Sequence, residues 1–350
     1  MKIGIYGLTN VGKSTFVNFL CGQDVSIVSS ERGTTTDPVR RRFEILDYAP
    51  VTFIDTAGLD DSGELGQERV RKSYQTLMEI DLAIIVTWGG CSDPLELDLV
   101  SRLESTPYIV IDRCCYPSSA DEVFSLIRSR VPSASLVSTD FYGGRISSGD
   151  FVILVCPIDS EAPSGRMILP QMQGVRSALD LGALALVVQP SELEAALASC
   201  SARLVVTDSQ AFDFVRGVVG DLCPVTSFSI LLAELKGDVS LYRRGLAYID
   251  QLVLGDRVLI IESCSHQVSC EDIGRVKIPF LLDRYLGFSL EYTFVSGRDS
   301  LPEDLASYRF AVHCGGCMTN RSHILRRLSV LDRSGVYVTN YGMLLERLLV

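Results

Sequence analysis

The sequence predicts an α/β fold class with three consecutive α/β domains. Over residues 1–143, short apolar runs of strand length alternate with longer stretches in which apolar residues recur at helical spacing. The segment FYGGRISSGD at 141–150, rich in Gly and Ser, interrupts this alternation and indicates a domain boundary. A second and a third α/β series follow it. We therefore expect domains at 1–143, 150–250 and 251–350.

In the first domain, the order of strands and helices predicts a doubly wound sheet with one antiparallel edge strand. MKIGIYG is a predicted strand, and GKSTFVNFLCG is a predicted helix with Phe16, Val17 and Leu20 on one face. RRRFEIL and VTFIDTAG, joined by the turn-like DYAP, predict an antiparallel hairpin. The following segments alternate between helix and strand: ERVRKSYQTLMEI, DLAIIVTWG, PLELDLVSRLES, TPYIVID, ADEVFSLIRSRV and ASLVST.

The later domains continue the alternation. The second has no glycine-rich phosphate loop and is interpreted as a packing or assembly module; its expected strands are DFVILVCPI, ALALVVQ, ARLVVTD and CPVTSFS. In the third, strands are expected in RVLIIESCS, YRFAVHCGGC and GVYVTNY. TNRSHILRRLSVL is a predicted helix, on which we expect His323 to be solvated.

Composition limits the classes of partner. The net charge of −11 argues against binding to nucleic acid or to an anionic membrane, because phosphate surfaces attract basic patches. No apolar run reaches the roughly 18–20 residues of a membrane-spanning helix, and no signal peptide is expected before the first strand. The eleven cysteines are too few for a secreted disulfide scaffold. We therefore expect a cytoplasmic chain whose clustered cysteines are metal ligands or redox groups.

A phosphate-binding site is predicted near the N-terminus. GLTNVGKS at 7–14 fits the pattern G-x-x-x-x-G-K-[ST] between a strand and a helix. Its backbone N–H groups would converge on phosphate oxygens at a helix N-terminus. Lys13 would contact the β- and γ-phosphates, and Ser14 would bind Mg²⁺. Asp55 of DTAG would complete the magnesium shell, and Gly58 would turn toward the γ-phosphate.

Further candidates lie between and after these motifs. Thr35, in GTTTD at 33–37, is expected to bind Mg²⁺ and to sense the γ-phosphate. Glu68 is a weaker candidate for positioning water, since a solvated helix charge is the commoner role. The predicted nucleotide-binding set is Gly7, Asn10, Val11, Gly12, Lys13, Ser14, Thr15, Thr34, Thr35, Asp55, Gly58 and Asp112.

These motifs resemble those of GTPases of the translation-factor-like class, which implies a Ras-like P-loop GTPase domain. In the group with GxxNxGKS and GTTxD, the resemblance implies that Asn10 helps to bind K⁺ beside the phosphates. The guanine-recognition motif NKxD departs here, because IDRCC places Cys115 where a carboxylate is expected. A thiol cannot accept two guanine N–H bonds, so we expect weakened guanine preference.

The patterns C-x-H and H-C-x-x-C predict a soft-metal site in the third domain. Cys264 and His266 follow the strand RVLII, and His313, Cys314 and Cys317 follow the strand YRFAV. The carboxyl ends of parallel strands share one edge of a sheet, so we expect the two clusters to meet. Three thiolates select an iron–sulfur cluster, or zinc with one His.

The whole chain resembles the FeFe-hydrogenase maturation GTPase family (HydF). Besides the cysteine and histidine clusters, the resemblance rests on CPIDSEAPSGRMILPQMQ at 156–173, TDSQAF at 207–212, TSFSILLAELKGD at 226–238, EDIGRVKIP at 271–279 and HCGGCMTNR at 313–321. It implies a dimerization domain in the middle of the chain. It also implies a 4Fe–4S cluster held by Cys264, Cys314 and Cys317, with His266 or His313 as candidates for the fourth position.

The resemblance further implies a role and partners. A homodimer would receive a diiron precursor from radical-SAM maturases and pass it to apo FeFe-hydrogenase, with GTP, Mg²⁺ and K⁺ as cofactors. Two alternatives stay open: a zinc-stabilised regulatory GTPase, and a nucleotide-binding adaptor with weakened guanine specificity. Iron content separates the first alternative from the cluster carrier, and a comparison of GTP with ATP hydrolysis separates the second.

Overall fold

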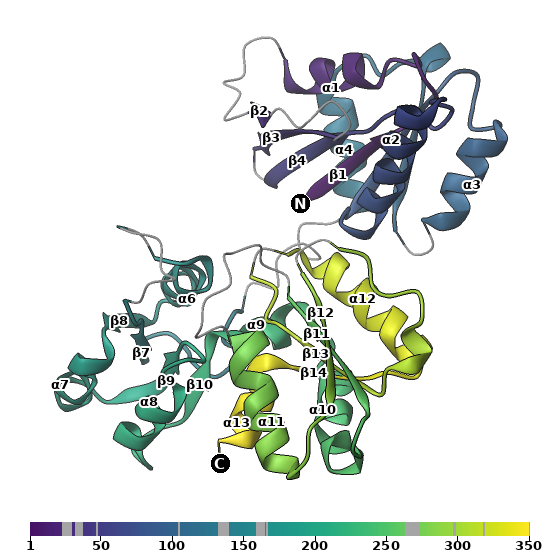
Figure 1. Cartoon of the computed structure of the whole chain (residues 1–350). Coiled ribbons are helices and arrows are strands. Elements are labelled where there is room, and N and C mark those ends of the chain that lie inside the picture. Colours follow the sequence, from purple (N-terminus) through teal and green to yellow (C-terminus); the bar gives the residue numbers. More distant parts are fainter. Residues whose placement is uncertain are drawn as a thin grey trace. The chain divides into compact units, whose positions relative to one another are not determined.

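In the computed structural model the chain forms two compact units, Met1–Ser138 and Thr139–Val350. Figure 1 shows the elements of both units, coloured along the sequence. Each unit is described by itself below. The residues that the structure describes are 1–22, 30–31, 38–46, 48–103, 106–131, 140–158, 165, 167–262, 273–296, 299–317 and 319–349.

The described residues of the first unit form a six-stranded sheet in the order β2-β3-β4-β1-β5-β6, with helices on its faces. β1 pairs in parallel with β4 and β5, and β5 pairs in parallel with β6. β3 pairs antiparallel with β4 and β2, which confirms the predicted hairpin and the mixed edge. The elements are β1 (Lys2–Tyr6), α1 (Lys13–Cys21), β2 (Ser30–Glu31), β3 (Val39–Ile45), β4 (Ala49–Asp55), α2 (Glu64–Gln75), η1 (Thr76–Met78), β5 (Leu82–Thr87), α3 (Pro94–Arg102), β6 (Tyr108–Asp112), η2 (Arg113–Cys115) and α4 (Ala120–Arg130).

Helices cover both faces of this sheet because β1 is apolar on both. Ile3 and Ile5 pack with Phe16 of α1 and Ile127 of α4, whereas Tyr6 packs with Leu99 of α3 on the other face (Figure 1). Strands buried on both faces are typical of parallel sheets in α/β proteins. The fold class predicted for this unit is therefore confirmed. The predicted strand ASLVST lies outside the described residues.

The described part of the second unit contains two four-stranded sheets, in the orders β10-β9-β7-β8 and β12-β11-β13-β14, and each strand pair found there is parallel. The strands are β7 (Phe151–Val155), β8 (Leu184–Val188), β9 (Ala202–Thr207), β10 (Val225–Ser227), β11 (Arg257–Ile261), β12 (Glu291–Val295), β13 (Phe310–His313) and β14 (Tyr337–Asn340). The α-helices are α6 (Leu169–Asp180), α7 (Leu193–Ser199), α8 (Phe212–Val219), α9 (Phe228–Lys236), α10 (Val239–Tyr248), α11 (Ile278–Leu286), α12 (Arg321–Arg333) and α13 (Tyr341–Leu348). Shorter helical turns are η3 (Pro190–Glu192), η4 (Ile249–Gln251), η5 (Ile273–Lys277) and η6 (Leu305–Ser307).

Helix α9 belongs to the cores of both sheets. Phe228 and Leu231 pack in the core that covers β7 and β9, and Ile230 and Ala233 pack in the core that covers β11 and β13. Its N-cap is Ser227, whose side chain accepts a hydrogen bond from Ile230 N. One helix thus contributes to the cores of both sheets. We propose that the two sheets belong to the predicted domains 150–250 and 251–350.

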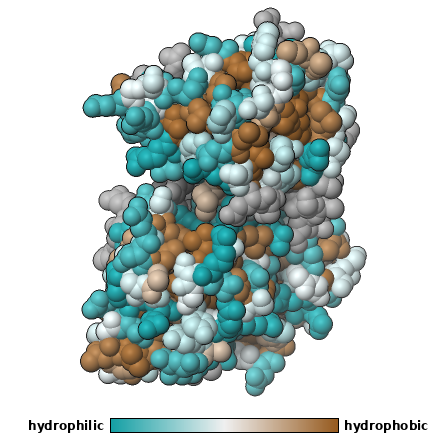
Figure 2. Space-filling view, turned by 90° about the vertical axis from the view of Figure 1, so that its right-hand side faces the viewer, coloured by the Kyte–Doolittle hydropathy of each residue, from teal (hydrophilic) through white to brown (hydrophobic). Residues whose placement is uncertain are grey.

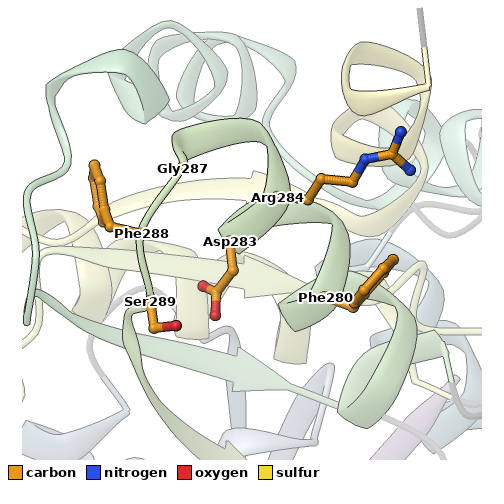
Figure 3. A pocket seen from close by; sticks show the side chains of 6 residues that line it. All are labelled: Phe280, Asp283, Arg284, Gly287, Phe288 and Ser289. Atoms are coloured by element: carbon orange, nitrogen blue, oxygen red, sulfur yellow. The ribbon is translucent and has the colours of Figure 1, made fainter.

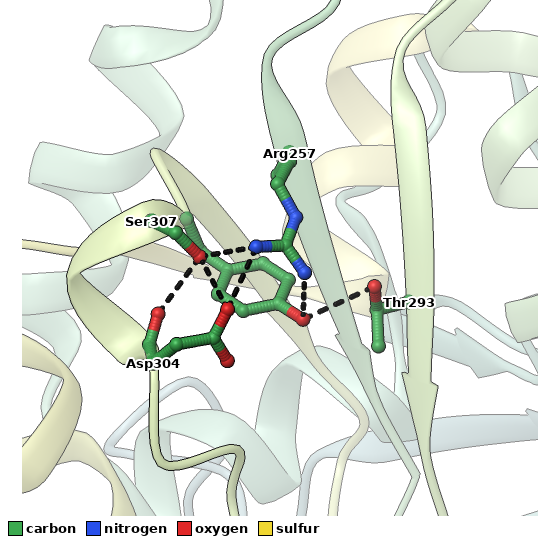
Figure 4. A network of polar contacts seen from close by, with 5 residues as sticks. Arg257, Thr293, Asp304 and Ser307 are labelled. Atoms are coloured by element: carbon green, nitrogen blue, oxygen red, sulfur yellow. Dashed lines mark hydrogen bonds and ion pairs between the residues drawn. The ribbon is translucent and has the colours of Figure 1, made fainter.

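A polar network fixes the amino-terminal end of β11. Arg257 Nη1 lies 2.8 Å from Asp304 Oδ2, and Arg257 Nη2 donates to Tyr308 Oη at 2.8 Å. Tyr308 Oη donates in turn to Thr293 Oγ1 of β12 at 3.2 Å, and Figure 4 shows these side chains converging across the strands. The network holds the amino-terminal end of β11, opposite to the end at which Cys314 N donates to Ile261 O.

Candidate functional site

The loop between β1 and α1 has a backbone that only glycine allows at two points. Gly7 and Gly12 have φ values of 144° and 95°, and a Cβ on Gly7 would lie 2.2 Å from Val86 O. Lys13, at the first position of α1, is 7% exposed. Its Nζ donates to Gly7 O at 3.2 Å and to Leu8 O at 2.8 Å. The loop therefore wraps around a buried ammonium group at a helix N-terminus, as phosphate binding requires.

Ser14 and Asp55 come together at the carboxyl end of β4. Burial raises the pKa of Asp55, while a hydrogen bond from Ser14 and the charge of Lys13 lower it. Asp55 Oδ1 is buried and has no hydrogen-bond partner among the described residues. A hydroxyl beside a buried carboxylate oxygen of this kind fits a hard divalent cation such as Mg²⁺. Thr35, the third predicted Mg²⁺ ligand, and Thr34, predicted to bind nucleotide, lie outside the described residues.

The DTAG segment lies directly against the phosphate loop. A Cβ on Gly58 would lie 2.7 Å from the backbone N and Cα of Thr9, and Thr9 N donates to Asp60 Oδ1 at 2.5 Å. A change in the conformation of the DTAG segment therefore requires a change in the phosphate loop. Glu68 lies on α2, where its Oε1 is 3.6 Å from Lys72 Nζ, the arrangement of a solvated helix pair.

The base-recognition end is built around Asp112 and Arg113. Asp112 Oδ1 accepts hydrogen bonds from Gly89 N at 2.9 Å and Cys114 N at 2.8 Å, which fixes the turn after β6. Arg113 Nη1 donates to Val11 O at 3.1 Å, so this side chain rests on the phosphate loop. The sequence analysis missed Arg113, although a basic residue at the second position of the motif was a usable signal.

The sulfur end starts from two neighbouring parallel strands. In the register of β11 and β13, Ile261 lies opposite His313, and Cys314 N donates to Ile261 O at 2.9 Å. Cys264 comes three residues after Ile261, a length of chain that spans at most about 10 Å. The two strand ends therefore meet as predicted. Cys264 and His266 themselves lie outside the described residues.

The H-C-x-x-C segment folds back on itself at Gly316, which has a φ of 64°. Gly316 N donates to Cys314 Sγ at 3.4 Å, and the thiols of Cys314 and Cys317 are half-buried. A tight turn with a backbone N–H aimed at sulfur fits thiolate ligation of a soft metal. The described ranges, which omit 263–272, contain no group of three or more His, Cys, Asp or Glu residues able to hold a metal ion.

His313 is held next to this segment. It is 0% exposed, and its Nδ1 lies 2.7 Å from Cys314 O. Burial lowers the pKa of His313, which favours the neutral imidazole, a form able to act as a ligand. Its Nε2 is buried with no hydrogen-bond partner in the described part of the chain. These features fit a ring beside a metal centre.

One ion pair links residues on either side of 263–272. Arg275 Nε and Nη2 each lie 3.1 Å from the carboxylate oxygens of Glu262, and Arg275 Nη2 donates to Ser296 Oγ at 2.5 Å. Glu262 and Arg275 flank residues 263–272, so this pair joins both ends of the segment that carries Cys264.

The prediction that His323 is solvated was wrong: it is 6% exposed, because it lies on the inner face of α12.

A surface hollow elsewhere has no comparable chemistry. It has a volume of about 330 Å³ and lies beside α11. Figure 3 shows Asp283 among its lining side chains Phe280, Arg284, Phe288 and Ser289, with Gly287. Asp283 Oδ1 already accepts hydrogen bonds from Tyr292 Oη at 2.7 Å and Leu290 N at 3.2 Å. Its one carboxylate is therefore engaged in holding β12.

Comparison with known proteins gives one family match in the first unit and two in the second. The family model "50S ribosome-binding GTPase" matches residues 2–112. The tRNA modification GTPase MnmE of Chromobacterium violaceum is 35% identical over 108 residues, 31% of this chain and 23% of that protein. GTPase Der of Sulfurimonas denitrificans is 41% identical over 102 residues, 28% of this chain and 20% of that protein. The chain thus spans less than a quarter of the length of these two relatives.

Among solved structures, Era in complex with MgGDPNP and a fragment of 16S ribosomal RNA is 29% identical and has a TM-score of 0.27. The match covers 37% of this chain and 45% of that one. No helix in the described ranges combines the length and the apolar character needed to cross a membrane.

The rest of the chain matches two models of one family. The hydrogen maturase F dimerization domain matches residues 141–237, and the hydrogen maturase F tetramerization domain matches residues 240–349. Together these two matches span more than half of the chain, and both lie C-terminal to the GTPase match. The chain therefore belongs to the hydrogen maturase F family.

Proposed function

We propose that this chain is a scaffold and carrier in FeFe-hydrogenase maturation, which binds a 4Fe–4S cluster and hydrolyses GTP. The observation that supports it best is the pairing of β11 with β13, which joins Cys314 to the strand end three residues before Cys264. Membership of the hydrogen maturase F family supports the same role. The GTPase-domain match supports the nucleotide chemistry.

The proposed ligands of the cluster are Cys264, Cys314 and Cys317. A 4Fe–4S cluster held by three thiolates supplies one iron with an exchangeable position, at which a cargo ligand can bind. His266 and His313 are the candidates to occupy or flank that position. The neutral, buried ring of His313 supports its candidacy. The diiron precursor is cargo, received from radical-SAM maturases and passed to apo FeFe-hydrogenase.

In the nucleotide site, Lys13 contacts the β- and γ-phosphates, and Ser14, Asp55 and Thr35 bind Mg²⁺. The close approach of Gly58 to Thr9 supports a role for Gly58 in linking the γ-phosphate to the DTAG segment. Nucleotide state then gates partner release through the switch segments 22–37 and 55–70. Asn10 binds K⁺ beside the phosphates, where added positive charge offsets charge that develops during hydrolysis.

Self-association involves β8, an edge strand of the dimerization part of the chain, by which we mean residues 141–237 that match the dimerization domain. Leu184 and Val187 of this strand are 50% and 42% exposed, and Leu179 of the adjoining α6 is 64% exposed. An apolar edge strand with unpaired backbone groups is a template for pairing with another chain. Figure 2 shows several apolar patches on the surface, so exposure of apolar side chains does not by itself single out β8. The position of β8 at the edge of its sheet is what supports this assignment.

The first prediction concerns the cluster. After anaerobic reconstitution with iron and sulfide, the wild-type chain is expected to be brown and, when reduced, to give the EPR signal of a 4Fe–4S cluster. Cys314→Ala is expected to lose most of the bound iron, while Cys200→Ala, a half-buried cysteine in the same unit, keeps it. A colourless protein with one zinc, or equal iron in Cys314→Ala and wild type, would contradict the proposal.

The second prediction concerns guanine preference. Cys115→Asp restores a carboxylate at the fourth position of the motif, on an exposed residue after β6. The preference for GTP over ATP, measured as a ratio of dissociation constants by calorimetry, should rise roughly 5- to 150-fold, the effect of about 1–3 kcal/mol. Cys114→Asp is the matched control and should leave the ratio near that of the wild type. An unchanged ratio in Cys115→Asp would remove this residue from base recognition.

The third prediction concerns potassium. Phosphate release from GTP should be faster in K⁺ than in Na⁺ at equal ionic strength. Asn10 has a φ of 59°, so Asn10→Gly removes the side-chain amide without straining the backbone. This variant should show similar rates in both salts. Equal rates in the wild type, or an unchanged potassium preference in Asn10→Gly, would exclude the assigned role.

The fourth prediction concerns the dimer. Leu184→Lys/Val187→Lys should shift the chain from dimer to monomer, because two charges on the edge of the sheet oppose strand pairing. Light scattering after size-exclusion chromatography measures the mass. Leu222→Lys is a control near the opposite edge strand β10 and changes a residue that is 74% exposed. A dimeric double variant would show that β8 is not the interface.

A further inference from the structure

The side chain of Lys236 joins the two parts of the second unit. Lys236 is the last residue of α9, within the match to the dimerization domain. Its Nζ donates to Gly316 O at 2.8 Å, Thr319 O at 3.0 Å and Cys317 O at 3.3 Å. The three acceptors lie in the match to the tetramerization domain. An ammonium group has three N–H donors, and three carbonyl groups of this one loop accept hydrogen bonds from it.

The three hydrogen bonds set the orientation of the loop. With its carbonyl groups turned toward Lys236, the loop can direct backbone N–H groups toward sulfur, and Gly316 N donates to Cys314 Sγ at 3.4 Å. Hydrogen bonds to cysteine sulfur and nearby positive charge both stabilise thiolates and tune iron–sulfur centres. Lys236 supplies the charge and fixes the geometry of the N–H donor.

Other residues of α9 and their neighbours support the same loop. A Cβ on Gly315 would lie 3.3 Å from Ser229 Oγ and 3.6 Å from Leu232 Cβ, so the helix surface lies directly under this glycine. Ser229 Oγ donates to Asn340 Oδ1 at 3.3 Å, and Asn340 Nδ2 donates to His313 O at 3.1 Å. The helix therefore contacts the H-C-x-x-C segment along its length.

A basic residue in the last turn of a helix also favours the helix dipole. That role would need the ammonium group only near the carbonyl groups that end α9. Here the end of α9 is closed by Gly237 N, which donates to Ala233 O at 2.8 Å, and Lys236 Nζ donates outside the helix. The geometry is that of a clamp on the loop.

We propose that Lys236 is a positioning residue for the sulfur ligands Cys314 and Cys317, contributed by the dimerization part of the chain. This inference rests on the proposed function, in which these thiols hold iron. It deepens that function, because the position of α9, a helix within the match to the dimerization domain, sets the positions of three carbonyl groups of the ligand loop.

Hydrogen exchange on the full-length, metal-free chain tests the clamp without any cluster. Lys236→Met keeps the aliphatic stem and removes the three donors, and amide exchange at Gly316 and Thr319 should become at least about tenfold faster. Arg243→Met, a change at an exposed residue of the neighbouring α10, is the control and should exchange like the wild type. Lys236→Arg retains the charge and should recover part of the protection. Exchange within twofold of the wild type in Lys236→Met, or equal acceleration in Arg243→Met, would overturn the proposal.

A second arm measures the loss of iron from reconstituted protein to a chelator. Lys236→Met should release iron about tenfold faster than the wild type, with Lys236→Arg between the two. A wild type that binds no iron would end the proposed cluster function, while the exchange arm would still decide whether Lys236 clamps the loop. A wild type that binds iron, with a Lys236→Met release rate equal to it, would end the positioning role alone.

Discussion

The parallel pairing of β11 with β13 is the constraint on which the sulfur site depends. Residues that are distant along the chain can share a metal only if the fold brings their strand ends together. The register that places Ile261 opposite His313 does this, and the hydrogen bond from Cys314 N to Ile261 O extends the pairing one residue beyond the strand. The Glu262–Arg275 ion pair then closes the intervening segment at its base.

The shared helix α9 connects the two sheets of the second unit. Its apolar residues fill the cores of two sheets, and its last residue holds the ligand loop. A helix buried on two sides cannot shift without changing both cores, since protein interiors are packed closely. The helix thus links the part that matches the dimerization domain to the proposed sulfur ligands Cys314 and Cys317. The nucleotide unit has an analogous internal link, in which Gly58 packs on Thr9 of the phosphate loop.

Local sequence patterns were sufficient for most of the fold, though not for β12, and for part of the sites. Glycines at Gly7 and Gly12 and apolar runs such as RVLII depend on neighbours along the chain, so they could be read directly. The contacts of Arg113 and Lys236 could not, because their partners Val11 and Gly316 lie 102 and 80 residues away, although the place of Arg113 in the motif was a usable signal. His323 was misjudged for a different reason. It shares the inner face of α12 with Ile324 and Arg327, and helical spacing from these neighbours indicates burial.

Differential alkylation tests the convergence of the three thiols most directly. The full-length chain, reconstituted with iron and sulfide or left without metal, is treated anaerobically with iodoacetamide, and each of its eleven cysteines is quantified by mass spectrometry. The account predicts that Cys264, Cys314 and Cys317 are protected together in the reconstituted chain and react when iron is removed. Protection of Cys314 and Cys317 with unchanged labelling of Cys264 would contradict it.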